Sequence, residues 1–424
     1  MVRRILPALM VVIGLALACG SAEEPAAKAP AAAATPAPKA AAEVPADLPL
    51  GLLVAISKFE RQDGKPLPKS ELMMLVREGG KWTTTQIGDA DSNVFHKAMV
   101  YTPPGQAPGI LTLGGSEAAL KLWRKGADGQ LAPVETLWQE DFGGKFSRMR
   151  DAEAADLFGD GNSALAVATH DQGVFAVVRP KTGGGYDVIK MDAEPDKFIH
   201  EIEIGDLDGD GVLEVYATPS DPNKLDGKPQ HGEVVRYIPA TNEGRVVVAD
   251  LGGRHAKEIL VDDVDGDGRD ELYVSIEAAE GGDLEIRRYD ADTDPKAGYT
   301  VATLSDPMAR FLTVGDVEGD GAKEMVVAAK DSGLWMLRPG EDPKAVWKKS
   351  LIDAKSKGFE HAALLTDLDG DGRDELYVAS DDDKELRRYV WQDGKIDREV
   401  IHRRSETLPI LTWNLMPVPV ELIR

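Results

Sequence analysis

Cysteine is nearly absent from this chain: Cys19 is the single one among 424 residues. A secreted form therefore cannot be held together by disulfide bonds and needs another source of stability. The apolar run at residues 5–17 is too short to span a bilayer stably. The sequence also lacks a Gly-x-Ser-x-Gly motif, which excludes the nucleophile elbow of α/β-hydrolases.

Basic side chains are fewer than acidic ones in this sequence. The chain has 49 Lys and Arg against 73 Asp and Glu, for a formal net charge of −24. Such a surplus of negative charge repels phosphate backbones and excludes nucleic acid as a natural partner.

The first residues predict an envelope location. Arg3 and Arg4, the apolar run and Ala18-Cys19 are typical of a secretory signal, and the cysteine after a small residue resembles the bacterial lipobox. We expect a lipoprotein signal peptide at 1–18, an acylated Cys19 with an Ala/Pro-rich tether at 19–47, and a folded domain at 48–424. Gly20 then implies the outer membrane, with the lipid as the membrane contact. An ordinary signal peptide with a chance cysteine remains the alternative.

One short acidic pattern is abundant. Four nearly complete copies, Asp-x-Asp/Glu-Gly-Asp-Gly-x-x-Glu, begin at Asp206, Asp263, Asp316 and Asp367. Carboxylates at positions 1, 3, 5 and 9 can surround a hard cation, while the glycines take the positive φ angles of a tight turn. The sequence therefore predicts an array of calcium-binding loops. A degraded fifth copy spans Asp156 to Ala164, where Phe158 and Ala164 replace two of the carboxylates, and we expect no cation there.

The loops repeat at intervals of 50, 57, 53 and 51 residues, which is the period of propeller blades and similar repeats. Short apolar runs precede and follow each loop, and two further strand candidates complete a set of four, as in Gly333 to Leu337 and Ala345 to Leu351. Four short strands per repeat make a β-propeller blade.

The loop between two such strands resembles the FG-GAP/VCBS repeat family, which also forms the calcium-bearing blades of integrin α-subunits. The resemblance covers roughly residues 95 to 400 and implies one Ca²⁺ in each of four loops. The implied metal ligands are Asp206, Asp208, Asp210, Glu214, Asp263, Asp265, Asp267, Glu271, Asp316, Glu318, Asp320, Glu324, Asp367, Asp369, Asp371 and Glu375.

Counting blades predicts an all-β, seven-bladed propeller. Residues 99–113 match the shape of the loop but carry no carboxylates, which adds a sixth blade upstream. Three strands near residues 52–59, 71–77 and 82–87 and one at 409–415 supply a seventh blade, built from both ends of the domain. Closing the ring in this way removes exposed sheet edges.

A second set of residues recurs six positions before the first aspartate of a loop. These are Arg150, His200, Lys257, Arg310 and His361. The family places ligands on the face opposite the calcium loops, where this collar would bind an anion or an acidic glycan. Alternatively, these side chains simply fill the channel mouth and pair with Glu201, Glu203 and Glu360.

Two function classes remain open. We favour a calcium-stabilised, non-enzymatic binding or scaffold module for a protein or glycan, and expect a monomer. The alternative is a polysaccharide lyase or hydrolase acting on acidic glycans, or a quinone-dependent dehydrogenase. A cluster of acid and base groups in a concave pocket would distinguish them.

Overall fold

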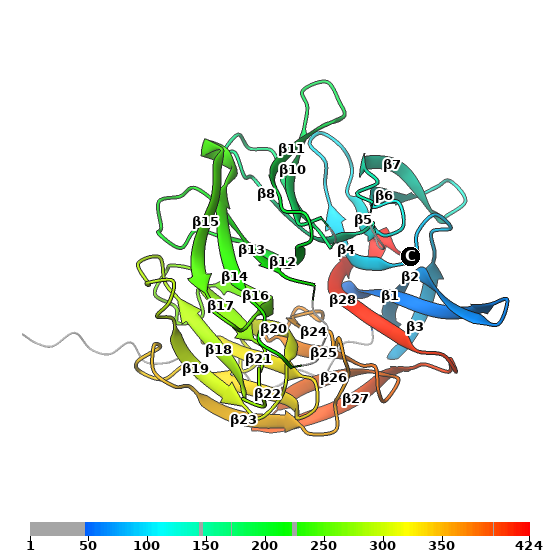
Figure 1. The fold of residues 1–424 in the computed structure, drawn as a ribbon. Coiled ribbons are helices and arrows are strands. Elements are labelled where there is room, and N and C mark those ends of the chain that lie inside the picture. Colours follow the sequence, from blue (N-terminus) through cyan, green and yellow to red (C-terminus); the bar gives the residue numbers. More distant parts are fainter. Residues whose placement is uncertain (1–46, 144–146, 171, 223–226, 393) are drawn as a thin grey trace, which may run out of the picture. The chain divides into compact units, whose positions relative to one another are not determined.

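The computed structural model describes residues 47–143, 147–170, 172–222, 227–392 and 394–424. Cys19, the expected signal peptide and all of the expected tether except Asp47 lie outside these residues. The described part consists of seven four-stranded antiparallel sheets arranged as the blades of a propeller (Figure 1). This architecture confirms the predicted all-β fold with seven blades.

The strands follow one another blade by blade, from the innermost strand outwards. Blade 1 contains β28 (Ile410–Pro419), β1 (Leu50–Gln62), β2 (Lys65–Glu78) and β3 (Lys81–Ile87). Blade 2 contains β4 (Phe95–Tyr101), β5 (Gly109–Gly114), β6 (Ala119–Lys125) and β7 (Leu131–Gln139). Blade 3 contains β8 (Met149–Ala155), β9 (Ala164–Thr169), β10 (Val174–Pro180) and β11 (Tyr186–Ala193). Blade 4 contains β12 (Phe198–Gly205), β13 (Glu214–Ser220), β14 (Glu233–Ile238) and β15 (Glu243–Asp250).

The last three blades repeat this order. Blade 5 contains β16 (Ala256–Asp262), β17 (Glu271–Ile276), β18 (Leu284–Tyr289) and β19 (Tyr299–Leu304). Blade 6 contains β20 (Ala309–Gly315), β21 (Glu324–Ala329), β22 (Gly333–Arg338) and β23 (Lys348–Asp353). Blade 7 contains β24 (Ala363–Thr366), β25 (Glu375–Ser380), β26 (Glu385–Gln392) and β27 (Lys395–Arg403). Two short 3₁₀ turns are η1 (Pro239–Thr241) and η2 (Val420–Leu422).

Blade 1 closes the ring. β28 pairs antiparallel with β1, from Leu50 opposite Pro419 to Lys58 opposite Ile410. Three N-terminal strands and one C-terminal strand therefore share a sheet, as the sequence predicts. Because β28 is the innermost strand of that sheet, the end of the domain lines the central axis (Figure 1).

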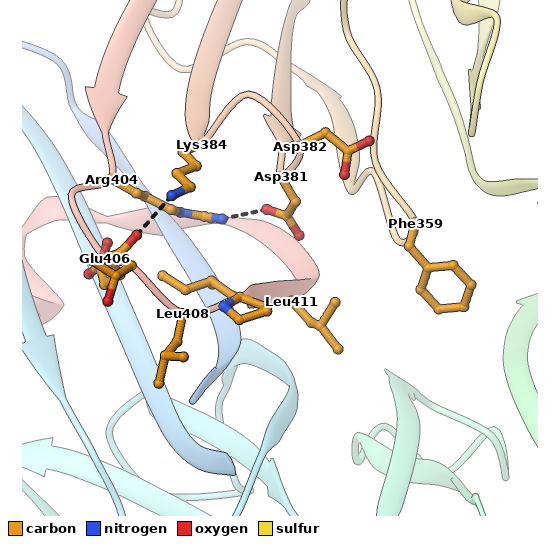
Figure 2. A pocket seen from close by; sticks show the side chains of 11 residues that line it. Phe359, Asp381, Asp382, Lys384, Arg404, Glu406, Leu408 and Leu411 are labelled. Atoms are coloured by element: carbon orange, nitrogen blue, oxygen red, sulfur yellow. Dashed lines mark hydrogen bonds and ion pairs between the residues drawn. The ribbon is translucent and has the colours of Figure 1, made fainter. Parts of the chain in front are cut away.

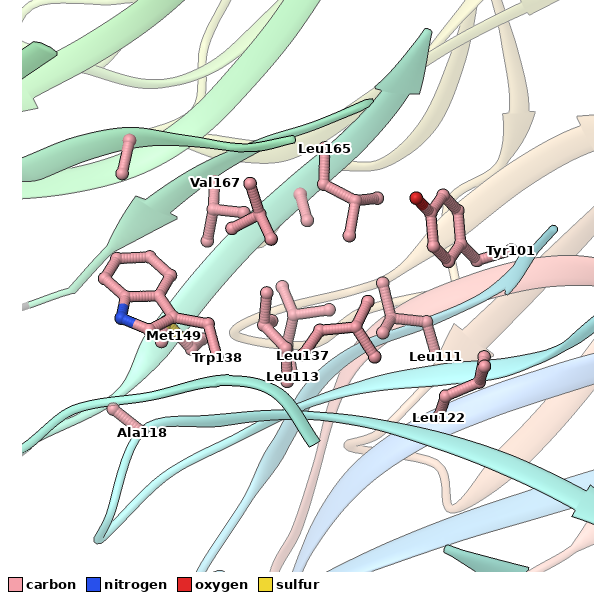
Figure 3. Close-up of a cluster of buried hydrophobic side chains, with 14 of the residues drawn as sticks. Tyr101, Leu111, Leu113, Ala118, Leu122, Leu137, Trp138, Met149, Leu165 and Val167 are labelled. Atoms are coloured by element: carbon pink, nitrogen blue, oxygen red, sulfur yellow. The ribbon is translucent and has the colours of Figure 1, made fainter. Parts of the chain in front are cut away.

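The hydrophobic core lies between neighbouring blades. In the cluster between blades 2 and 3, Leu111 and Leu113 of β5 face Leu165 and Val167 of β9 (Figure 3). Comparable clusters fill the interface of every other pair of neighbours. Alternating strand residues point to opposite faces of a sheet, so both faces of each blade contribute to a cluster. Packing between blades therefore uses the apolar residues and leaves charged side chains for the axis and the loops.

Two aspartates connect consecutive blades at the start of a loop. Asp374 Oδ2 of blade 7 accepts a hydrogen bond from the backbone N of Asp316 in blade 6 at 2.8 Å. Asp270 of blade 5 does the same for Asp206 N in blade 4 at 2.9 Å. Gly315, which precedes Asp316, leaves room for the carboxylate, because a Cβ atom there would overlap Asp374.

We expect Gly315→Ala to lower the free energy of unfolding by about 1–3 kcal/mol, since overpacking at a fixed contact displaces its partner. Thermal melting of the purified domain measures the effect. Gly340→Ala is the control, because a Cβ at Gly340 meets no atom within 4 Å. Equal melting temperatures for the two variants would contradict the proposed contact.

No helix in the described ranges is both long enough and apolar enough to cross a membrane.

Candidate functional site

The acidic loops join the innermost strand of a blade to the second strand in blades 3 to 7. Glycines at positions 4 and 6 have positive φ in all five loops, for example 76° at Gly266 and 89° at Gly268. The first aspartate organises the turn, since Asp263 Oδ1 accepts a hydrogen bond from Gly266 N at 2.7 Å and Oδ2 accepts one from Gly268 N at 2.9 Å. These loops therefore have the tight geometry that the sequence predicts.

In three loops the carboxylate oxygens lie close to one another. Ligand atoms lie within 4.8 Å of one another in each of three groups, Asp206 with Asp208 and Asp210, Asp367 with Asp369 and Asp371, and Asp263 with Asp265, Asp267 and Glu271. Carboxylate oxygens in a flexible loop are the ligands that Ca²⁺ takes. The residues of these three loops fit a hard divalent cation.

The remaining implied ligands are placed differently. Among the described residues, the loop from Asp316 to Glu324 brings no three ligand atoms together, and Asp320 joins no cluster. The longer side chain of Glu318 reaches instead to Arg338 Nη2 at 2.9 Å. Glu214, Glu324 and Glu375 also stand outside the clusters, because each accepts a hydrogen bond from the backbone N of the second loop residue, as Glu375 does from Leu368 N at 3.2 Å.

An arginine on the third strand of each of these blades approaches the loop. Arg288 Nη1 lies 2.6 Å from Asp265 Oδ2 and its Nη2 lies 3.1 Å from Glu271 Oε1. Arg236, Arg338 and Arg388 make equivalent contacts with Glu214 at 2.8 Å, Glu324 at 3.0 Å and Glu375 at 2.5 Å. These arginines could not be identified from the sequence, because the interval from glutamate to arginine differs from blade to blade. Strand pairing places Arg236, Arg288 and Arg388 opposite a tyrosine two residues after the glutamate, whereas Arg338 lies two residues beyond the corresponding position.

The carboxylates of these loops repel one another despite the arginines. Burial raises the pKa of both Glu271 and Glu375 to about 7, and the aspartate at position 3 of the same loop adds to the shift. In the degraded loop of blade 3, Arg179 lies 3.9 Å from the Phe158 ring centre and 2.6 Å from Asp160 Oδ2. That guanidinium neutralises Asp160, one of the two carboxylates that remain in this loop beside Asp156.

A second feature is a bulge at the start of the inner strands. The pairing register with the second strand shifts by one residue in six blades, at His96, Arg150, His200, Lys257, Arg310 and Trp413. A bulge bends a strand and re-aims a side chain, and bulges are frequent beside binding sites. The bulges therefore turn side chains at equivalent positions towards the channel mouth.

Five of the six bulge residues, all except His96, line a pocket of about 190 Å³. Its lining is cationic and aromatic and is made of Arg148, Arg150, His170, Phe198, His200, Lys257, Arg310, Phe359, Glu360 and Trp413. Four of the five predicted collar residues thus meet in one pocket, at the ends of β8, β12, β16 and β20. Glu360 is the one acidic residue in this lining.

His361, the fifth predicted collar residue, lies elsewhere. It is fully buried, its Nε2 lies 2.8 Å from Ser356 Oγ and its Nδ1 lies 2.9 Å from the carbonyl oxygen of Ala329. β24 starts only at Ala363 and pairs with β25 without a register shift, so nothing turns His361 towards the axis. Burial lowers the pKa of His361 to about 4, which makes the imidazole neutral.

The cations of the pocket keep part of their hydrogen-bonding capacity. Arg150 donates to the carbonyl oxygen of His200 at 3.1 Å and contacts His96 Nδ1 at 2.7 Å. Arg310 lies 3.7 Å from Glu277 and 3.9 Å from Glu360, beyond hydrogen-bond distance in both cases. Both ring nitrogens of His200, which is 5% exposed, have no hydrogen-bond partner. The expected pairing of these side chains with neighbouring acids is therefore incomplete.

Burial also sets the charge of the pocket. Burial lowers the pKa of Lys257 to about 7, and nearby Arg310 lowers it further while Glu277 opposes the shift. His200 has a pKa well below its usual range, again because of burial and then because of Lys257. Of these two collar residues, Lys257 is therefore the one that can change its charge near neutral pH.

Below the mouth, the channel is acidic. Glu258 of β16 is buried and Glu201 and Glu203 of β12 are half-buried. Loss of water around each carboxyl raises its pKa well above the usual range. Lys97 is paired there with Asp151 at 2.8 Å and with Glu153. Lys97, the cation at this depth, is thus already paired with two carboxylates, so the mouth suits an anion better than the channel below it.

The fold and the loops together show that the protein is a seven-bladed β-propeller whose inner strands are followed by acidic loops. No protein-family model and no curated protein matches the sequence. Solved propellers are similar in structure. A candidate 6-phosphogluconolactonase from Bacteroides uniformis ATCC 8492 has a TM-score of 0.53 at 12% identity, over 88% of this chain and 100% of that one.

Two further structures match in the same way. A candidate 6-phosphogluconolactonase from Bacteroides fragilis NCTC 9343 has a TM-score of 0.51 at 13% identity, over 88% of this chain and 98% of that one. The periplasmic gluconolactonase of Pseudomonas aeruginosa has a TM-score of 0.50 at 14% identity, over 87% of this chain and 99% of that one. At such identities the likeness establishes the shared propeller fold.

Proposed function

We propose that this protein is a calcium-stabilised propeller of the FG-GAP/VCBS type, anchored in the bacterial outer membrane through Cys19, that binds an acidic glycan at the channel mouth. One observation supports the binding site above all: Arg150, His200, Lys257 and Arg310, from four different blades, converge on one pocket in a strongly acidic protein. A cationic spot on such a molecule attracts an anionic group and orients it.

The charges around the pocket favour an anionic ligand. Glu277 lies behind the cations, where it contacts His255 Nε2 at 3.0 Å and Lys257 Nζ at 3.5 Å. Although burial acts in the opposite direction, the hydrogen bond with His255 and the charge of Arg310 lower the pKa of Glu277 to about 2. Glu277 thus compensates part of the cationic charge, and the ligand would supply the remaining negative charge.

Binding of glucuronate-containing oligosaccharides by the purified domain tests the proposal. We expect Arg310→Met to weaken binding about tenfold to hundredfold, because a hydrogen bond to a charged group contributes about 1.5–3 kcal/mol. Lys296→Met is the control, since Lys296 is 78% exposed and carries the same charge outside the pocket. Affinity should also fall with added salt. Equal losses in both variants, or no binding to any acidic glycan, would contradict the site.

Hydrolysis of an acidic sugar derivative is the second candidate. His200 supports it, because its ring nitrogens have no hydrogen-bond partner and a neutral imidazole can accept a proton. Burial and the charge of Lys257 lower the pKa of this ring, so it would act as a weak base. The similar structures named as gluconolactonases point to the same class of reaction. Turnover of sugar lactones or acidic glycans that is lost in His200→Gln, while binding persists, would favour the enzyme over the binding module.

The anchor has its own test. We expect the wild-type protein to partition into the detergent phase of a membrane extract, because a diacylated Cys19 carries two apolar chains. Cys19→Ser should leave the protein unprocessed or release it into the soluble fraction. Recovery of the wild-type protein only in the soluble fraction would overturn both the anchor and the outer-membrane location.

A further inference from the structure

A second cavity adjoins the channel-mouth pocket. It has a volume of about 240 Å³ and lies between blade 7 and the start of β28. Phe359 lines both cavities. On β28, Leu411 lines the second cavity, and Trp413, two residues further along the strand, lines the channel-mouth pocket. Each cavity alone is smaller than the about 300–1,000 Å³ of a typical ligand pocket, whereas the two together reach that size.

The walls of the second cavity are of two kinds. Leu408, Leu411 and Phe359 present apolar surface, and the Arg404–Asp381 ion pair stands opposite the two leucines (Figure 2). Asp381 Oδ2 also accepts a hydrogen bond from the backbone N of Thr412 at 2.7 Å. These contacts fix the charged wall to β28, so the cavity is formed before any ligand arrives.

Buried polar atoms at the two cavities lack hydrogen-bond partners. Arg404 Nε is such a donor, and Glu406 Oε2 and Glu360 Oε1 are such acceptors. An unpaired buried polar atom costs free energy, so a ligand that pairs with it gains affinity. A hydroxyl group both donates and accepts, whereas an alkyl chain in the second cavity would leave Arg404 Nε and Glu406 Oε2 unpaired.

We propose that the second cavity binds a neutral sugar unit, so that the ligand is an oligosaccharide whose acidic unit occupies the channel-mouth pocket and whose neighbouring unit lies between Phe359 and Leu411. The apolar faces of a sugar ring suit the aromatic and aliphatic wall, and its hydroxyls suit the unpaired atoms. This inference rests on the proposed binding of an acidic glycan and specifies the ligand as at least a disaccharide.

Calorimetric titration of the folded domain with four probes tests this. The probes are glucuronate, a disaccharide of glucuronate and a neutral hexose, cellobiose, and octanoate. We expect the acidic disaccharide to bind about tenfold more tightly than glucuronate, as for a ligand that gains a buried aromatic contact. Cellobiose, which lacks the anion, and octanoate, which lacks hydroxyls, should bind more weakly than the acidic disaccharide.

Variants separate the two cavities. Leu411→Ala should remove the gain of the disaccharide and leave glucuronate binding unchanged, because Leu411 lines only the second cavity. Leu351→Ala, at an apolar residue that is 45% exposed on the outermost strand β23, is the matched control. If Leu411→Ala lowers the melting temperature, the isosteric variant Glu406→Gln is used in its place. It should also reduce the difference in affinity between the acidic disaccharide and glucuronate.

The outcomes distinguish the two proposals. If glucuronate and the disaccharide bind equally well, the second cavity is not a sugar subsite, although the acidic-glycan function stands. If octanoate binds more tightly than the disaccharide, the cavity is an alkyl site and the inference is wrong. If neither acidic sugar binds, both the function and the inference fail.

Discussion

Chelation of divalent cations should lower the melting temperature of the 48–424 domain by several degrees relative to millimolar calcium. Three loops hold clusters of carboxylate oxygens within 4.8 Å of one another, and these repel when no cation is bound. A ligand that binds only the folded state stabilises it by about 2.7 kcal/mol per site when its concentration is one hundred times the dissociation constant. Scanning calorimetry with calcium and with chelator measures the shift.

Loop variants provide the controls for this experiment. Asp208→Ala and Asp369→Ala should each remove one calcium ion, as counted by titration, and part of the melting shift. Asp160→Ala should change neither, because Asp160 pairs with Arg179 at 2.6 Å and belongs to no described metal cluster. A melting curve that is the same with calcium and with chelator would refute the calcium loops.

Affinity for an acidic glycan should fall by up to about tenfold per pH unit above pH 7, since binding then requires one proton. The free Lys257 has a pKa of about 7, and a bound anion raises it. Binding is therefore at full strength below the free pKa and weakens as the pH rises towards the pKa of the complex. Titrations between about pH 6 and 9 measure the slope.

Other charged and titratable groups also face Lys257. Arg310 stays charged, Glu277 and Glu360 are carboxyls of the same site, and His200 and His255 are the nearby imidazoles. His200 has its pKa well below 6.5, so the ring is already neutral in this range. Lys257→Arg is the matched variant, because a guanidinium keeps its charge to above pH 12. An unchanged slope in that variant would assign the proton to another group.

The blades could be predicted from the sequence because their signals are local. Each acidic loop needs glycines with positive φ between two apolar strands, and this combination repeats along the chain. The interval between loops then limits the number of blades. The strands left over at the two ends of the domain are enough for one further sheet, which contains both β1 and β28. None of these steps depends on contacts between distant residues.

The pocket required the three-dimensional structure. Counting back from the loops found Arg150, His200, Lys257 and Arg310 because each lies at a bulge, but the bulges themselves come from cross-strand pairing. The same count failed at His361, where β24 begins late. No acidic loop comes after Trp413 in the sequence, so a count back from the loops could not reach this residue. The cavity beside Phe359 depends on β28 meeting blade 7, a contact between residues far apart in the sequence.

Ring closure by β28 also has a consequence for the order of events during synthesis. The innermost strand of blade 1 ends at Pro419 and pairs with Leu50, so a growing chain cannot complete that sheet until almost the whole domain has been made. Until then the ring is open and the channel mouth lacks Trp413. The domain therefore stays incomplete during most of its synthesis, and ligand binding at the channel mouth would begin only after the ring has closed.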